Sequence, residues 1–483
     1  MEKSILKQLE LKIQGEVLSS REFREFYSVD ASSYKIIPKI IVIPKNENDV
    51  ISTVKIAKKR KISVTVRGAG TGLVGSALNS GIILDMKNFS SIRLDKNQVR
   101  VESGVIKGHL DKKLEASKKF FPPNPSIGSF CSVGGMLGNN SSGSRSLKYG
   151  SVIDNVKEIT FVDGNGNKIT LPKNKKVAKQ VKKIANNIEL EKFPKVSKNS
   201  SGYRLDKIKT ENDIHKAIIG SEGTLGIILS AKLQIKDKPK KQVLFVAEYD
   251  SLIEAANNCL EINKTNPSAI EFVDKTTFDQ IKSKFNKKSK CLLFVEYDEK
   301  INSNEKKFKE RVTGKIVKKL QTKEEIAKWW RYRDSSLHYS LKSIKKENRI
   351  PHIIEDAVVP LENFPKLFSI LNKLNKKYKT KSIVYGHAGN GNVHVRLISK
   401  RKKVTIIKKI AVEYFDEIIK LGGSITAEHG DGLARSEFIK KQYGSKNYQT
   451  FKKIKKYFDP VNILNPGKII TSKSSIIENL EPF

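Results

Sequence analysis

A glycine-rich loop between two strand-like segments is the feature that most restricts the fold of this chain. Residues 70–75, GTGLVG, match the dinucleotide fingerprint GxGxxG and follow the apolar segment 62–66. In a Rossmann unit a helix opens at such a loop and points its N-terminus at the pyrophosphate. Here a turn and a further apolar strand, 82–86, follow instead, which argues against a Rossmann fold. The loop can still bind phosphate through its backbone N–H groups and Arg67, although a tight surface turn is an alternative interpretation.

Two more loops share this composition. Gly134, Gly135 and Gly138 lie in an asparagine- and serine-rich run over 133–150, and residues 220–226, GSEGTLG, precede an apolar strand over 227–235. Such runs expose backbone N–H groups and small hydroxyls. We therefore expect a large polar ligand to lie against these loops.

Size and composition limit the class of protein. With 483 residues, the chain should form roughly two or three domains. No apolar run is long enough to cross a bilayer, and the N-terminus has no secretory h-region. The three cysteines form no CxxC motif, so we expect no iron–sulfur cluster within the chain. These features predict a cytoplasmic protein, with peripheral contact at the inner face of the membrane as an option.

The net charge of +41, from 92 Lys and Arg against 51 Asp and Glu, has two interpretations. One is binding to nucleic acid or an anionic membrane. The other is a lysine-rich proteome bias. The lysines are spread along the chain and no aromatic-interleaved RNA motif accompanies them, so we favour the bias and expect no nucleic-acid partner. The positive field should still attract anionic substrates or acidic electron carriers.

The sequence pattern changes near residue 236. Upstream, residues 40–44 predict a strand, and Asn46 can cap the helix that follows. Downstream, the near-copies 244–250, LFVAEYD, and 293–298, LFVEYD, predict two strands of an antiparallel sheet with helices between and after them.

A strand pair is predicted at 382–387 and 393–398, with Asn390-Gly391 as its hairpin signal. A helix over 403–420 should end at Gly422-Gly423.

Three of the seven histidines lie in two short motifs of this second half. His387 and His394 stand on either side of the predicted hairpin turn, and Glu428 and His429 follow a predicted short strand over 424–427. Two histidines and a carboxylate form a common ligand set for Zn²⁺, Mn²⁺ or Fe²⁺. From these residues alone, hairpin histidines that pack or bond to the backbone are the slightly favoured interpretation.

Four motifs in order resemble one protein family. They are 66-VRGAGTGLVG, 134-GGMLGNNSSGSRSLKYG, 221-SEGTLGII and 463-ILNPGK. The chain is similar over roughly residues 35–470 to the FAD-linked oxidase superfamily of vanillyl-alcohol-oxidase type. Within it, the chain resembles the branch that holds D-lactate dehydrogenase, glycolate oxidase and D-2-hydroxyglutarate dehydrogenase.

The resemblance implies an α+β fold in three parts. Residues 1–235 would form a two-part FAD-binding domain, and 236–440 an α+β cap or substrate domain with an antiparallel sheet and the metal site. Residues 441–483 would return to the FAD domain.

The resemblance also implies contacts with FAD. The pyrophosphate would lie along Arg67, Gly68, Ala69, Gly70, Thr71 and Gly72. The flavin would be lined by Pro123, Gly134, Gly135, Asn140 and Ser141. The adenine and ribose side would be held by Ser221, Glu222, Gly223 and Ile228, with Asn465 returning from the C-terminal part. Thr71 stands where covalent members of the family carry a histidine, so we expect noncovalent FAD. One departure is 140-NSSG, where many relatives have Asn-Ala-Gly-Gly, which we interpret as a subfamily mark.

The histidine motifs GHxGxGNxH and EHGxG resemble the metal signature of the hydroxy-acid branch. Carried over, His387, His394 and Glu428 would bind the metal, for which we expect zinc, with manganese or iron as alternatives. His429 would be the general base, Asn392 would bond the substrate, and Arg333 would bind its carboxylate.

The expected activity is oxidation of a D-2-hydroxy acid, such as D-lactate or glycolate, to the 2-oxo acid by hydride transfer to flavin N5. Ile354 stands where relatives specific for a dicarboxylate carry a lysine, which favours a short monocarboxylate, although Arg396 offers another cation. A separate electron acceptor is needed: a cytochrome, a quinone, an electron-transfer flavoprotein or an iron–sulfur protein. Alternatives are an enzyme of alkyl-dihydroxyacetonephosphate synthase type, a catalytic subunit that needs partners, and, in another class, a basic nucleic-acid-binding protein. The oligomeric state is left open, with a dimer as an option.

Overall fold

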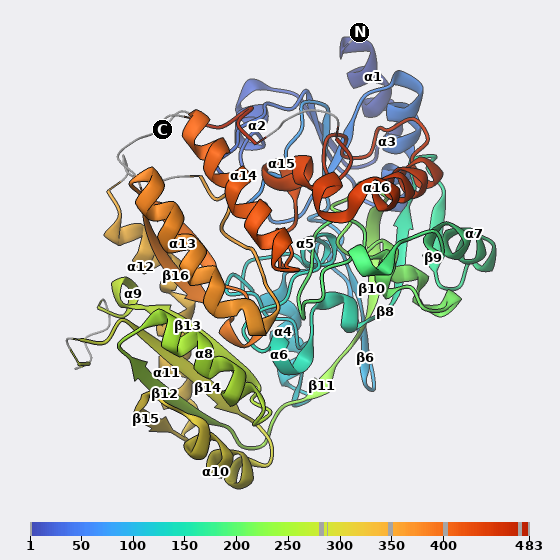
Figure 1. The fold of residues 1–483 in the computed structure, drawn as a ribbon. Coiled ribbons are helices and arrows are strands. Elements are labelled where there is room, and N and C mark those ends of the chain that lie inside the picture. The colour runs from blue at the N-terminus through green and yellow to red at the C-terminus, as the bar shows by residue number, and fades with distance from the viewer. Residues whose placement is uncertain are drawn as a thin grey trace.

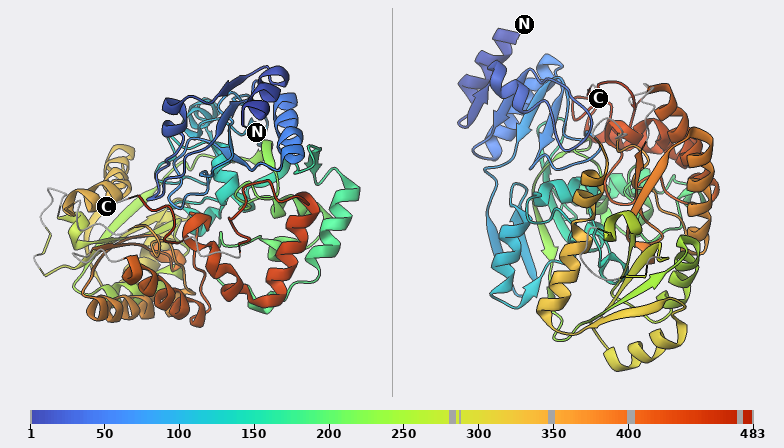
Figure 2. Two further views of the ribbon diagram at one scale, coloured as in Figure 1. Left: turned by 90° about the horizontal axis from the view of Figure 1, so that it is seen from above. Right: turned by 90° about the vertical axis from the view of Figure 1, so that its left-hand side faces the viewer.

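The computed structural model describes residues 2–279, 285–286, 288–345, 351–398, 404–471 and 476–481. Three main sheets organise them, two in the N-terminal half and a larger one in the second half (Figure 1). Figure 2 shows the blue N-terminal elements and the yellow to orange elements of the large sheet as separate masses, with the red C-terminal segment beside the green strands. The fold is the α+β arrangement expected for an FAD-binding domain joined to a cap domain.

The first sheet contains the fingerprint loop. Its strand order is β1-β2-β4-β3, and β4 runs parallel to both β2 and β3. These strands are β1 (Glu16–Leu18), β2 (Ile40–Ile43), β3 (Val64–Arg67) and β4 (Ile82–Asp85). Helix α3 (Glu47–Arg60) begins where predicted, because the Asn46 side chain accepts hydrogen bonds from two backbone N–H groups of its first turn. Residues 68–81 pass from β3 to β4 without a helix, so the prediction that this is not a Rossmann unit is confirmed.

The second sheet is antiparallel, in the order β5-β6-β10-β8-β9. Its strands are β5 (Ile92–Asp95), β6 (Gln98–Glu102), β8 (Val156–Val162), β9 (Lys168–Leu171) and β10 (Ile227–Gln234). The second glycine run, expected as a loop, opens with the short helix α5 (Val133–Asn139), because the Ser132 hydroxyl accepts from Gly135 N at 3.2 Å and caps it.

The C-terminal segment packs on this second sheet. Helix α16 (Ile439–Phe458) contributes several buried apolar side chains to the core that also holds residues of β6, β8 and β10. In Figure 1 it lies beside β10 and α7 (Lys175–Ala185), and it contacts α7. The domain boundaries at 235 and 440 stay a prediction.

The third sheet has six antiparallel strands in the order β15-β12-β14-β13-β16-β17. They are β12 (Val243–Tyr249), β13 (Ala269–Asp274), β14 (Cys291–Tyr297), β15 (Lys315–Leu320), β16 (Lys381–Gly386) and β17 (His394–Ile398). The two near-copy segments are β12 and β14, which pair directly. One face packs on helices α8 (Leu252–Asn263), α10 (Ile301–Arg311), α13 (Phe364–Tyr378) and α14 (Val404–Lys420), and the other on α11 (Lys323–Asp334).

The predicted strand pair is confirmed as β16 and β17, and Asn390-Gly391 lies in the connection 387–393, which contains a 3₁₀ turn. The residues after Ile235 form the short strand β11 (Lys236–Asp237), which pairs with β7 (Lys119–Phe120). One local expectation needs correction. The predicted strand at 424–427 is a single bridge, between Ser424 and Val358.

Candidate active site

One continuous cavity joins the glycine loops to the histidine cluster. One end of the cavity is lined by most of the residues predicted to bind FAD: Arg67, Gly68, Ala69, Gly70, Thr71, Gly72, Gly134, Gly135, Ser141, Glu222, Gly223 and Ile228. Its other end is lined by His387, His394, Glu428 and His429. The two predicted halves of the site therefore meet in one space.

Four predicted FAD contacts are not among the lining residues, although all are described in the structure: Pro123, Asn140, Ser221 and Asn465. Asn465 instead ties loops together, because its Nδ2 donates to the carbonyls of Ser76 and Glu222, and its Oδ1 accepts from Thr65. Asn140 donates from Nδ2 to the Asn199 carbonyl and accepts at Oδ1 from Ile153 N. These side chains support the wall of the cavity from behind.

The cavity wall fits a nucleotide with a pyrophosphate. A Cβ added at Gly68 would lie 2.0 Å from Ser132 Oγ, so only glycine permits this close approach of two loops. Arg67 is buried, and its Nη1 has no hydrogen-bond partner among the described residues. A buried guanidinium nitrogen without a partner is costly unless an anion binds it. A pyrophosphate oxygen would supply that partner.

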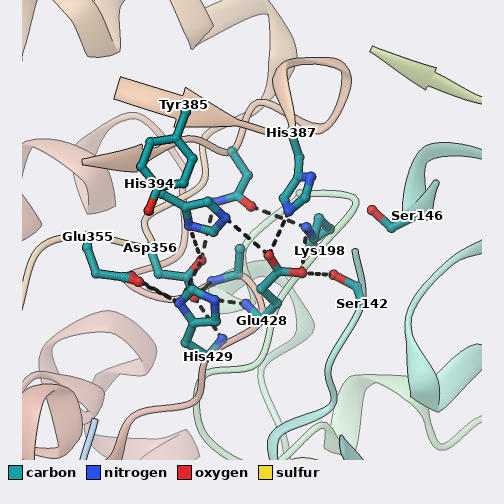
Figure 3. Close-up of polar contacts among 12 residues, drawn as sticks. Ser142, Ser146, Lys198, Glu355, Asp356, Tyr385, His387, His394, Glu428 and His429 are labelled. Carbon is teal, nitrogen blue, oxygen red and sulfur yellow. Dashed lines mark hydrogen bonds and ion pairs between the residues drawn. The ribbon is translucent and has the colours of Figure 1, made fainter. Parts of the chain in front are cut away.

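The cluster at the other end is built from two strands and a loop (Figure 3). His387 follows β16, His394 begins β17, and Glu428 and His429 lie in the loop after α14. Glu428 Oε1 lies 2.7 Å from His387 Nε2 and 3.4 Å from His394 Nε2. Burial would raise the pKa of Glu428, but Lys198 and His387 hold it well below the usual range of a glutamate.

These three side chains fit a divalent metal. Two ligand atoms at about 2.1 Å from one ion lie about 3.0 Å apart at a right angle and about 3.4 Å apart at the tetrahedral angle. The two nitrogen–oxygen separations are close to these values, and all three candidate ligand atoms lie within 4.8 Å of one another. Burial lowers the pKa of His394 to about 4, so its imidazole is neutral at physiological pH, as a metal ligand must be.

Residues from the FAD-binding half hold this carboxylate from the other side. Lys198 Nζ lies 2.9 Å from Glu428 Oε2, and the Ser142 hydroxyl also donates to Oε2. Oε1 is thus left facing the imidazoles. His387 Nδ1 lies 2.8 Å from Glu271 Oε1, an orienting contact of the kind that metal-binding histidines make.

His429 faces a different pair of carboxylates. Its Nδ1 lies 2.7 Å from Glu355 Oε1. Burial would lower the pKa of His429, but Glu355 and Asp356 raise it to about 9. Asp356 Oδ2 accepts hydrogen bonds from the backbone N–H groups of residues 427–429 and from the Thr426 hydroxyl. The Asp356 carboxylate therefore fixes the start of the loop that carries Glu428 and His429.

A second histidine–carboxylate group fits a metal less well. It consists of Glu355, Asp356, His394 and His429. Its carboxylates already have partners, because Arg435 Nη2 lies 3.3 Å from Glu355 Oε2 and Asp356 binds backbone N–H groups. The neighbouring guanidinium would also repel a cation.

In the structure, the residues predicted to contact the substrate bind other residues of the protein. Arg333, only 2% exposed, pairs with Glu271 at 2.5 Å and does not line the cavity. Asn392 donates to the Ala357 carbonyl and accepts from Lys198. Their substrate roles stay predictions. Ile354 is buried in the core of the large sheet, and Arg396 donates to Tyr385 and lies 3.9 Å from Glu355.

Sequence reasoning missed Lys198, Ser142, Glu271 and Glu355. The first two had a signal, because Ser142 lies in the second glycine run and Lys198 begins 198-KNSSG, a stretch of the same small polar composition. Glu271 lies within the apolar strand β13, and Glu355 precedes Asp356 in an otherwise apolar stretch, and neither pattern forms a recognisable motif.

Among the described residues, no helix is both long enough and apolar enough to span a bilayer.

Two family models match the chain. "FAD binding domain" matches residues 38–171, and "FAD linked oxidases, C-terminal domain" matches residues 238–469. A solved structure of alkyldihydroxyacetonephosphate synthase has a TM-score of 0.69 at 18% identity, covering 96% of this chain and 86% of that one. That likeness shows the fold alone.

Curated relatives carry related names. The chain is 29% identical to glycolate oxidase subunit GlcD of Bacillus subtilis, over 92% of each protein. It is 27% identical to D-lactate dehydrogenase of Archaeoglobus fulgidus, over 89% of this chain and 91% of that protein. It is 27% identical to D-2-hydroxyglutarate dehydrogenase of Haemophilus influenzae over 97% of this chain, but spans only 52% of that longer protein. The chain therefore belongs to the FAD-linked oxidase family of flavin-dependent oxidoreductases.

Proposed function

We propose that this protein oxidises a short D-2-hydroxy acid to the 2-oxo acid, using noncovalent FAD and a divalent metal bound by His387, His394 and Glu428. The single observation that carries the proposal is the continuous cavity, which brings the glycine-lined FAD wall and this cluster together. The names of the curated relatives support hydroxy-acid substrates.

The charges around the cluster suit an anionic substrate. Four buried carboxylates, Glu271, Glu355, Asp356 and Glu428, face four buried cations, Lys198, Arg333, Arg396 and Arg435. The four negative and four positive side chains balance one another. A divalent metal would leave the site positive, which favours a carboxylate and the deprotonation of a hydroxyl beside it.

The residues of the site can each take a separate role in this reaction. When bound, FAD accepts the Cα hydrogen with its electron pair, and the metal lowers the pKa of the substrate hydroxyl. His429 lines the cavity and is held by Glu355 through Nδ1, so its other nitrogen is the candidate acceptor of the hydroxyl proton. A separate electron carrier would have to reoxidise the flavin, because the three cysteines are buried, lie far apart in the sequence and offer no iron–sulfur motif.

We favour a short substrate such as D-lactate or glycolate. Ile354 packs in the core, so it adds no cation, and Arg396 is buried against Tyr385 and does not line the cavity. Neither position therefore places a cation on the cavity lining for a second carboxylate of the substrate.

The test is anaerobic mixing of purified protein with glycolate and with D- and L-2-hydroxy acids. We expect the oxidised flavin band at about 450 nm to bleach with glycolate or a short D-acid, and not with the L-acids. A chelator should abolish bleaching, and added Zn²⁺ or Mn²⁺ should restore it. His387→Ala should retain the flavin colour but lose metal and bleaching, whereas the exposed His109→Ala should behave as wild type.

Colourless protein would contradict the flavin assignment. Bleaching that survives both the chelator and His387→Ala would remove the metal from the mechanism. Bleaching by L-acids alone would reverse the proposed stereochemistry.

A further inference from the structure

Glu222 lies on the cavity wall among the residues expected to hold the nucleotide, yet its carboxylate accepts hydrogen bonds from other residues of the protein. Oε1 accepts a hydrogen bond from Asp431 N at 2.6 Å. Oε2 accepts from Gly432 N at 2.9 Å and from Ser76 Oγ at 2.5 Å. Two of these three donors, Asp431 N and Gly432 N, lie where the loop that carries Glu428 and His429 meets the short helix α15 (Gly432–Arg435). The carboxylate thus joins this loop to the FAD-binding half.

The backbone of Glu222 is itself held by the FAD-binding half. Its N–H donates to the Gly138 carbonyl at 2.9 Å, and its carbonyl accepts from Asn465 Nδ2 at 2.7 Å. Its φ of +51° lies in the left-handed region, which a residue with a side chain occupies at a cost of about 1 kcal/mol or more. Such a conformation persists only where its surroundings require it, and here it points the carboxylate at the loop that carries Glu428 and His429.

The rest of that loop lies equally close to the FAD-binding half. Leu433 N donates to the Val74 carbonyl at 2.8 Å. A Cβ at Gly430, where φ is +85°, would lie 2.9 Å from Glu222 Oε1. A Cβ at Gly432 would lie 2.2 Å from the Val74 carbonyl. Residues 430–433 therefore dock on the segment 74–76 and on Glu222 with no room for side chains at the two glycines.

We infer that Glu222 is a positioning residue that fixes the loop 428–433 to the FAD cradle and so sets the distance between His429 and the flavin, rather than a ligand of the nucleotide. Both oxygens of its carboxylate already accept hydrogen bonds from protein donors. Burial raises the pKa of this carboxylate, and in its ionised form it would repel the phosphates of the nucleotide. Removing the carboxylate should leave FAD affinity unchanged or tighter, while the loop loosens. The activity part of the inference rests on the proposed function, and the loop and FAD measurements do not.

The test compares FAD-loaded wild type with Glu222→Gln and Glu222→Ala. Glu222→Gln is nearly isosteric and should fold, but it presents an NH₂ group to one of the present donors. We expect amide exchange in the segment 428–436 to accelerate at least tenfold, while segments 66–75 and 134–142 keep wild-type exchange. The Kd of FAD, from titration of the apoprotein, should stay within twofold or fall. The rate of flavin reduction by the hydroxy acid should drop at least tenfold.

Glu115→Ala, which removes an exposed carboxylate of the same half, is the matched control and should match wild type in every measurement. A tenfold weaker FAD affinity in Glu222→Gln would make Glu222 a nucleotide ligand and overturn the inference, as would unchanged exchange in 428–436. If no hydroxy acid reduces the wild type, the proposed function fails, and exchange and FAD affinity still decide the role of Glu222.

Discussion

His394 and His429 stack at 4.9 Å between ring centroids, yet they have opposite protonation preferences. Burial lowers the pKa of His394 to about 4. Burial acts on His429 in the same direction, but the nearby carboxylates outweigh it and raise its pKa to about 9. A neutral imidazole suits a metal ligand and a basic one suits a proton acceptor. A divalent ion beside His394 would lower the pKa of His429 towards neutrality.

Glu355→Gln should move the pH dependence of flavin reduction. The base accepts a proton only when neutral, so the rate rises with pH through the pKa of His429. Losing the Glu355 charge removes the largest influence that raises this pKa, and the rising limb should shift to lower pH by at least about one unit. The plateau should also fall, because Nδ1 loses its orienting partner. Stopped-flow reduction rates between pH 6 and 10 measure both effects, and an unshifted limb would show that His429 is not the base.

Arg333 has two candidate roles, ion pairing with buried Glu271 and binding of the substrate carboxylate, and a substitution can distinguish them. Arg333→Met would leave Glu271 buried without its guanidinium, so we expect the free energy of unfolding to fall by about 3–5 kcal/mol. Adding Glu271→Leu should recover most of this loss, because the uncompensated charge then disappears. Denaturant unfolding of the two single variants and the double variant measures the coupling. Unchanged stability of Arg333→Met with tenfold weaker substrate binding would instead favour the predicted carboxylate contact.

At the scale of elements, the connection between β16 and β17 shapes the metal cluster. The strands pair with Tyr385 opposite His394, so His387 and His394 leave the sheet edge close together. Between them the chain bends through a 3₁₀ turn, and Gly391 adopts a φ of +69°. The turn reaches the FAD-binding half, where the Asn390 amide bonds Ser146 and Ser197. These contacts hold the connection against the FAD-binding half.

Two glycines with similar φ test this connection. A Cβ at Gly391 would lie 2.1 Å from the Val359 carbonyl, whereas Gly444, with φ +77° inside α16, has nothing within 4 Å. Gly444→Ala should therefore lower the free energy of unfolding by only about 1 kcal/mol through backbone strain, and Gly391→Ala by at least about 3 kcal/mol through strain and overlap. Chemical denaturation compares them. Equal losses would show that the contact with Val359 relaxes freely.

Local chemistry explains which elements the sequence predicted. The Asn46 cap, the loop between β3 and β4, and the pairing of β16 with β17 depend on neighbouring residues and could be predicted. The short helix after Ser132 was missed because a run of glycines suggests a loop. The Asp356 and Lys198 contacts could not be predicted, since they join residues 72 and 230 positions apart (428 − 356 and 428 − 198). For the same reason the sequence predicted a substrate contact for Arg333: its ion pair with Glu271 joins residues far apart in the chain.

At the scale of the whole molecule, polar contacts join the FAD-binding half to the large sheet. Arg145 forms two hydrogen bonds with Glu296, at 2.6 and 2.7 Å, and stacks 4.8 Å from the Trp330 ring. Lys148 and Tyr149 both bind Asp298. Together with the Glu222 contacts, these bonds hold the two halves around the cavity. The net positive charge of the chain should attract anionic molecules that approach the protein.

The net charge of +41 should make the encounter with anionic reactants depend on salt. Raising ionic strength from about 20 to about 200 mM shortens the screening length severalfold and weakens long-range attraction. We expect the second-order rate constant for reoxidation of the reduced flavin by ferricyanide, a multivalent anion, to fall severalfold over this range. An uncharged quinone should show little change, because the field does not steer it. Equal behaviour of the two acceptors would mean that the lysines do not direct the electron acceptor to the flavin.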